Sequence, residues 1–89
     1  MIPYTYMEPS KIIESRQGTH GSFAENSRLT QAFIKVAKSS INWDKLNDMQ
    51  LEALHMNFHK ISRALSGDYN ESDHWIDAGN YMHLPEKFK

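Results

Sequence analysis

Two helix-start signals, each followed by apolar residues at helical spacing, limit the possible folds of this chain more than any other feature. Ser22 stands three residues before Glu25, and Asn47 stands three residues before Gln50, which is the spacing of reciprocal helix caps. The apolar residues that follow recur with a period of about 3.6 and form one stripe on each segment. These stripes are Leu29, Phe33, Val36 and Ala37, and then Leu51, Leu54, Phe58, Ile61 and Leu65, the second being expected as the inner face of its helix. No segment alternates as a strand does, so the sequence predicts an all-α fold.

The breaker and capping residues predict where the helices begin and end. Pro9 suits a first helical position, and Gly18 suits a stop. Gly67 is expected to end the third helix, and Ser72 to cap the fourth. Pro85 is expected to prevent much continuation of that last helix. The predicted helices are residues 9–16, 22–38, 48–65 and 73–82.

The chain length and the connections predict one domain with two short ends. A chain of 89 residues corresponds to a single domain, 1–89, with an N-terminal extension at 1–8 and a C-terminal tail at 83–89. The short connection from Ser66 to Ser72 predicts that the third and fourth helices pack as an antiparallel pair. The expected architecture is therefore a small bundle of about four helices.

Composition excludes several functional classes. The formal net charge of −1 removes the main reason to expect nucleic acid as a partner. The chain has no cysteine, and so has no thiolate metal site and nothing that suggests an oxidising compartment. No apolar run approaches the ~20 residues that span a bilayer. A cytoplasmic protein that does not enter a membrane is the expectation.

Carboxylate and imidazole groups gather on the third and fourth predicted helices. Asp73 and Asp77 lie one turn apart on the same face of a helix, and Tyr81 follows one turn later. The preceding helix carries three further candidate ligands. The candidate metal ligands are Glu52, His55, His59, Asp73 and Asp77. Two carboxylates at this spacing can hold a divalent cation, or they can pair with cations of the neighbouring helix.

Two basic residues on the third helix have two interpretations. Lys60 and Arg63 are candidate phosphate-binding groups, because a guanidinium or ammonium group is a good partner for phosphate oxygens. The alternative is that they form structural ion pairs with Asp73 and Asp77. The short connection between the helices favours the ion pairs, since unpaired charges near a core are costly.

The sequence resembles a family of small phage-encoded proteins of uncharacterised function. The resemblance rests on Arg16, His20, Gly21, Phe23, Asn26 and Arg28, and continues through Lys60-Ile61-Ser62-Arg63 and Asp73-His74-Trp75-Ile76-Asp77 with Tyr81. It implies a phage-encoded protein located in the host cytoplasm.

The second half is also similar, more distantly, to MazG-like all-α nucleoside triphosphate pyrophosphohydrolases. That resemblance implies a nucleotide partner and Mg²⁺ held by a Glu-x-x-Glu pair and a later acidic pair. Here Glu52 is followed by His55 where the second Glu is expected. Imidazole is a poor ligand for Mg²⁺ and a better one for Mn²⁺. The resemblance therefore implies Mg²⁺ or Mn²⁺ as the cofactor, with weakened or lost hydrolysis.

Three functional classes follow from these observations. The sequence favours a binding protein that inhibits or modulates a host or defence protein on a degenerate MazG-like scaffold. The alternative is a metal-dependent protein that binds or hydrolyses nucleoside triphosphates, and the third class is a self-assembling structural module. A thin core with many apolar residues also predicts a homo-oligomer, most simply a dimer. The candidate interface residues are Trp43, Trp75 and Tyr81.

Overall fold

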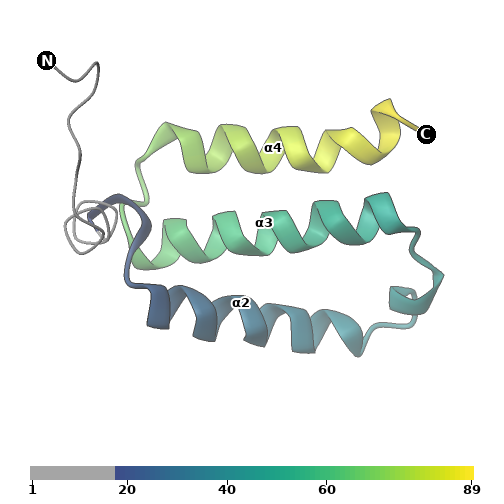
Figure 1. The fold of residues 1–89 in the computed structure, drawn as a ribbon, viewed down its shortest axis with the longest axis horizontal. Helices are drawn as coiled ribbons and strands as arrows, with labels where there is room; N and C mark the ends of the chain where they lie inside the picture. Colours follow the sequence, from purple (N-terminus) through teal and green to yellow (C-terminus); the bar gives the residue numbers. More distant parts are fainter. Residues whose placement is uncertain (1–17) are drawn as a thin grey trace, which may run out of the picture.

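The computed structural model describes residues 18–89, which fold into three antiparallel helices arranged side by side (Figure 1). The elements are α2 (Phe23–Lys38), the 3₁₀ turn η1 (Trp43–Lys45), α3 (Asp48–Ser66) and α4 (Ser72–Lys87). The third element, α3, lies between α2 and α4 and runs antiparallel to both (Figure 1). The all-α prediction and the antiparallel pairing of the last two helices are confirmed.

Both helix-start signals act as caps, though only one forms the complete capping box. The Ser22 hydroxyl accepts a hydrogen bond from the Glu25 amide at 3.1 Å. At α3 both bonds form: Asn47 Oδ1 accepts from the Gln50 amide at 2.8 Å, and Gln50 Oε1 accepts from the Asn47 amide at 3.0 Å. These side chains satisfy amides that have no partner inside the helix.

Several predicted boundaries are wrong. The described residues contain three α-helices rather than four, and the helix predicted at 9–16 lies outside them. Residues 18–20 are helical, so the stop predicted at Gly18 is replaced by Gly21, whose φ is 77°. A positive φ is costly for other residues, which makes glycine the suitable stop there.

The fourth helix begins earlier and ends later than predicted. Its first residue is Ser72, and the capping position belongs to Glu71, whose side chain makes no capping bond. The helix continues through Pro85 to Lys87, so most of the tail predicted at 83–89 is helical. Pro85 lacks an amide to bond the carbonyl of Tyr81. Because this lies in the last turn of a largely exposed helix, water can hydrate that carbonyl, and the helix ends shortly after the proline.

The three helices form an open layer rather than a closed bundle. On one side of α3, Ser62 is hydrogen-bonded to Thr30 of α2 at 2.7 Å, and on the other, Lys60 pairs with Asp77 of α4 at 2.9 Å. Ser62 and Lys60 point in opposite directions because each residue turns a helix by about 100°. Consequently α2 and α4 pack on α3 rather than against each other.

The side chains enclosed between the helices are small. Among residues 18–89, the buried residues with apolar side chains are Ala53 and Ala64, and the buried polar residues are Thr30, Asn57, Ser62 and His74. The stripe predicted as the inner face of α3 is only partly covered: Ile61 is 39% exposed and Leu65 is 65% exposed. That prediction is wrong in part, because Ile61 and Leu65 of the stripe face one open side of the layer, whereas Phe58 lies beside Phe33 of α2.

A tight joint connects the residues before α2 with the end of α3. The Asp68 amide donates to the Thr19 carbonyl at 2.9 Å, and the Gly67 amide donates to the Arg63 carbonyl at 2.8 Å. A Cβ on Gly67 would lie 2.6 Å from the Gly21 nitrogen, closer than real Cβ contacts allow. Glycine is therefore required at position 67 by the close approach of two backbones.

Substituting two glycines should shift stability in opposite directions. We expect Gly67→Ala to destabilise the fold by about 1–3 kcal/mol, because the new methyl group meets rigid backbone. Gly79 lies inside α4, where an added Cβ would meet nothing within 4 Å. Gly79→Ala should therefore stabilise the fold by about 0.5–1 kcal/mol. Thermal denaturation followed by circular dichroism measures both changes. A Gly67→Ala variant as stable as the unmodified chain would contradict the close approach of the two backbones at Gly67.

Candidate functional site

The residues predicted to bind a metal ion are divided between different sides of α3. His55 points toward η1, where its ring stacks on Trp43 with the centroids 5.9 Å apart and the planes at 19°. Asp77 lies on the α4 side, paired with Lys60. Glu52 and His59 are exposed. Within residues 18–89, no group of three or more histidine and carboxylate side chains is placed to hold a metal ion.

One of the predicted ion pairs forms. Lys60 Nζ lies 2.9 Å from Asp77 Oδ2, with the lysine side chain 13% exposed and the aspartate side chain 41% exposed. The ammonium group proposed to bind phosphate is thus partnered by a carboxylate of α4. Arg63 and Asp73, the other predicted pair, form no ion pair in the described part of the chain.

The three candidate interface aromatics have different environments. Trp43 is half-buried against His55. Trp75 is 62% exposed, and its indole N–H donates to the Tyr69 carbonyl at 2.8 Å. Tyr81 is half-buried between α3 and α4. Trp75 therefore presents the largest aromatic surface of the three.

Three of the residues on which the sequence resemblance to phage-encoded proteins is based, His20, Gly21 and Asn26, lie at the joint. Asn26 Nδ2 donates to the His20 carbonyl at 2.6 Å, and Asn26 Oδ1 accepts a hydrogen bond from the Ser66 hydroxyl. The Ser66 hydroxyl also approaches the Ser62 carbonyl, at 2.7 Å. Asn26 thus links the turn before α2 to the end of α3. Its role in this structure is to hold the joint together.

Arg28, another residue of that resemblance, forms a surface ion pair. Its guanidinium donates to both carboxylate oxygens of Glu25, at 2.6 and 3.0 Å. These hydrogen bonds, together with the positive charge of Arg28, hold the pKa of Glu25 below its ordinary value. The same hydrogen bonds and the negative charge of Glu25 raise the pKa of Arg28. Both side chains are solvated, so the pair acts as local support for α2.

His74 is a structural residue that lies within one of the sequence motifs but had no predicted role of its own. It is 2% exposed, and its Nε2 lies 2.9 Å from the Thr19 carbonyl. A carbonyl oxygen only accepts, so Nε2 carries a proton and donates this hydrogen bond. The His20 ring lies beside it, with centroids 5.3 Å apart. The sequence did contain a signal for the burial of His74. His74 lies three residues before Asp77, a spacing that puts both side chains on the face of α4 that meets α3.

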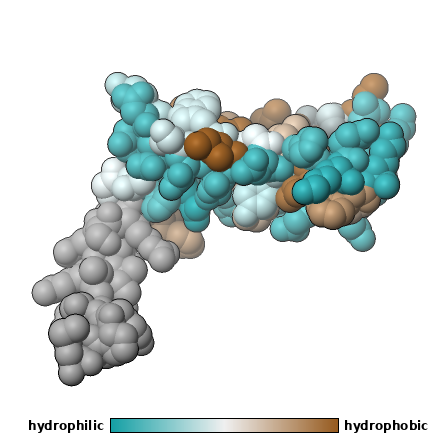
Figure 2. Space-filling view, turned by 90° about the horizontal axis from the view of Figure 1, so that it is seen from above, coloured by the Kyte–Doolittle hydropathy of each residue, from teal (hydrophilic) through white to brown (hydrophobic). Residues whose placement is uncertain are grey.

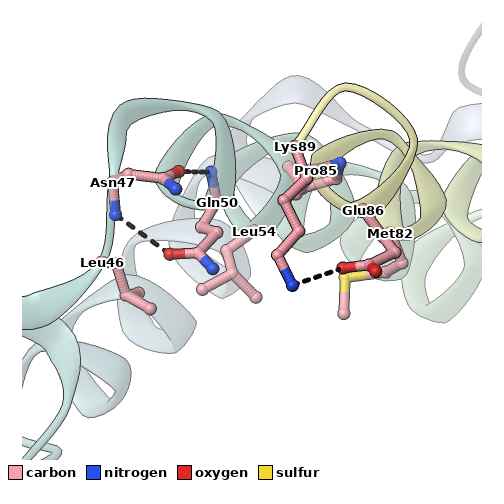
Figure 3. A pocket seen from close by; sticks show the side chains of 9 residues that line it. Leu46, Asn47, Gln50, Leu54, Met82, Pro85, Glu86 and Lys89 are labelled. Atoms are coloured by element: carbon pink, nitrogen blue, oxygen red, sulfur yellow. Dashed lines mark hydrogen bonds and ion pairs between the residues drawn. The ribbon is translucent and has the colours of Figure 1, made fainter.

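Two grooves flank the seam between α3 and α4, on either side of Ala53. Each has a volume of about 390 Å³. The first, shown in Figure 3, is lined by Leu46, Asn47, Gln50, Ala53, Leu54, Met82, Pro85, Glu86 and Lys89. It contains the capping box of α3 and an ion pair between Lys89 and Glu86 at 3.7 Å. Its lining is therefore partly polar.

The second groove, which we call the methionine groove, is more apolar. It is lined by Met49, Glu52, Ala53, Met56, Tyr81, Leu84 and Phe88. The small side chain of Ala53 leaves space between the two helices, and the larger side chains stand around that space. Glu52 is the charged residue of this lining.

Comparisons with known proteins do not assign a family. No family model matches the chain, and neither a curated protein nor a solved structure matches it. In residues 18–89, no helix is both long enough and apolar enough to cross a membrane.

The ion pair between Lys60 and Asp77 should contribute measurably to stability. We expect Asp77→Ala to lower the free energy of unfolding by about 1 kcal/mol, because it leaves a mostly buried ammonium group without its partner. Asp44→Ala is the control, since Asp44 is exposed in η1 and forms no ion pair among the described residues. Urea denaturation distinguishes the two variants, and equal small losses would contradict a structural role for Asp77.

Hydrolysis of nucleoside triphosphates should be weak or absent with Mg²⁺. Among residues 18–89 the carboxylates that would hold the ion are not gathered, and Asp77 is engaged by Lys60. Any residual turnover should favour Mn²⁺ over Mg²⁺. A panel of triphosphates assayed with each metal checks this, with Asp73→Ala and Asp77→Ala as controls. Robust Mg²⁺-dependent turnover that both substitutions abolish would identify an enzyme instead.

Proposed function

We propose that this protein acts by binding a helix of another protein in the methionine groove. The observation that carries the proposal is the groove itself, an open and largely apolar trough between α3 and α4. Leu84 and Phe88 stand at its edge, and their side chains are 38% and 61% exposed. Large apolar side chains around an open groove are typical of protein-binding surfaces.

The spacing of the lining residues suits a helical ligand. Met49 and Met56 lie two turns apart on α3, and Leu84 lies one turn before Phe88 at the end of α4. The two rows run along antiparallel helices, so the trough between them is elongated. An amphipathic helix can place apolar anchors at i, i+4 and i+7 into such a trough. Unbranched methionine side chains can adapt to those anchors.

The charge of the groove indicates the character of the ligand. Glu52 contributes the charged group of the lining, and its side chain is exposed. A helix with lysine or arginine beside its apolar anchors would place a cation next to this carboxylate. Such rim charges contribute to specificity and to the rate of association more than to affinity.

The resemblance to small phage-encoded proteins supports the choice of partner class. On that basis we propose that the helix belongs to a host or defence protein, and that binding inhibits or modulates it. The placement of Lys60, His55 and Asp77 in structural contacts is consistent with a protein that works by binding.

Photo-crosslinking at matched phenylalanine positions tests this function. A photoreactive phenylalanine analogue at Phe88 should capture a host protein, and the same analogue at Phe23 should not. Phe23 is 82% exposed at the start of α2, so it controls for simple exposure. The crosslinked segment, made as a peptide, should bind the protein in calorimetry. We expect Phe88→Glu to weaken that binding at least tenfold and Phe23→Glu to leave it unchanged.

Two results would contradict the proposal. Equal capture at Phe88 and Phe23 would show that the groove has no preferred protein ligand. A captured segment whose peptide does not become helical on binding would show that the groove takes another kind of ligand.

A further inference from the structure

An extended apolar surface covers one open side of the helix layer, opposite the methionine groove. We call it the apolar face. It consists of Leu29, Phe33 and Val36 from α2, Leu54, Phe58, Ile61 and Leu65 from α3, and Trp75, Ala78 and Met82 from α4. At 3.6 residues per turn, Leu54 and Met56 project to opposite sides of the layer, which separates this face from the groove.

Contacts between neighbouring helices make the apolar face continuous. The Phe33 and Phe58 rings lie 6.0 Å apart, joining α2 to α3 on this side. Leu54 and Met82 line the same depression, which joins α3 to α4 (Figure 3). By contrast, the view onto α4 from above shows a mostly hydrophilic edge, with hydrophobic surface near its middle and at its borders (Figure 2).

The folded layer leaves this face largely uncovered. Val36 is 71% exposed, Leu65 is 65% exposed, Trp75 is 62% exposed and Met82 is 56% exposed. The buried apolar residues within residues 18–89 are two alanines. A partner that covered this face would therefore bury large apolar side chains that the single layer leaves exposed. Removing that apolar surface from water lowers the free energy.

The apolar face carries no net charge, which favours one kind of occupant. Its ten residues are uncharged, and the two charged residues of the depression beside Leu54 and Met82, Glu86 and Lys89, pair with each other at 3.7 Å. In a symmetric interface the same surface meets itself, so a net charge would face a like charge. A neutral apolar surface avoids this repulsion and is complementary to its own copy.

We infer that the apolar face is a homodimer interface in which two copies of this chain stack layer on layer. The whole side of the layer that carries this face is about 28 Å long, because α3 has 19 residues, and about 25 Å wide, because the three helices lie 8–10 Å apart. The resulting area of roughly 700 Å² per chain is close to the ~800 Å² that each partner contributes to a standard stable interface. The row from Leu54 to Leu65 becomes the core of the dimer.

This interface is independent of the function proposed for the methionine groove. Stacking through the apolar face leaves the groove on the outside of the dimer, so both surfaces can be occupied together. The two surfaces are tested with different variants, and either proposal can fail without the other.

Light scattering on matched variants tests the dimer. The full chain should have about twice its monomer mass of 10.4 kDa at micromolar concentration. Leu65→Glu should give the monomer mass with its helical circular dichroism retained, since Leu65 is already exposed in the single layer. Ile76→Glu is the control, because Ile76 is 58% exposed on the outer side of α4, away from the face. This variant should remain a dimer.

Disulfide crosslinking provides a second measurement that does not depend on a destabilising charge. The chain has no cysteine, so an introduced cysteine reacts only with its copy. Ile61→Cys lies near the middle of the face and should give a covalent dimer on mild oxidation, whereas Ile76→Cys should not. A monomeric mass for the unmodified chain, or equal crosslinking at both positions, would overturn the inference.

Discussion

Small side chains on two opposite sides of α3 determine how the whole layer is built. Toward α2 the contact is the hydrogen bond between Thr30 and Ser62, and toward α4 the seam is formed around Ala53 and Ala64. Small residues let helix axes approach closely. The Ser62 hydroxyl lies 2.8 Å from the Phe58 carbonyl and also forms the hydrogen bond with the buried Thr30 hydroxyl, so neither hydroxyl is left without a partner. Because α3 packs through these small residues, its large apolar residues remain on a third side.

That arrangement connects the architecture to the proposed binding surfaces. A flat layer of helices has two open sides, and a closed bundle has none. One side carries the apolar face, and the other carries the methionine groove beside Ala53. Both are consequences of a single central helix that is covered from two directions only.

The joint at one end of the layer gives a structural role to polar residues for which the sequence predicted none. His74 donates to the Thr19 carbonyl, Asn26 binds the His20 carbonyl, and Gly67 allows the backbones to meet. Each bond satisfies a polar group in a place where water has little access. The imidazole of His74 and the amide of Asn26 are therefore explained by packing of the turn against α3 and α4.

The helices of the layer could be predicted from the sequence, because caps such as Asn47 with Gln50 and the 3.6-residue spacing act within one segment. The pairing of Lys60 with Asp77 could be predicted as well, since the connection between α3 and α4 is short. The side of α3 that each neighbouring helix covers could not be predicted from the sequence. An apolar stripe shows that a helix has a face to bury but does not show what buries it, so the row that includes Leu65 was predicted as inner and lies exposed. His55 is separated from Asp77 for the same reason: the rotation of α3 about its axis is set by the packing of small residues that are far apart in the chain.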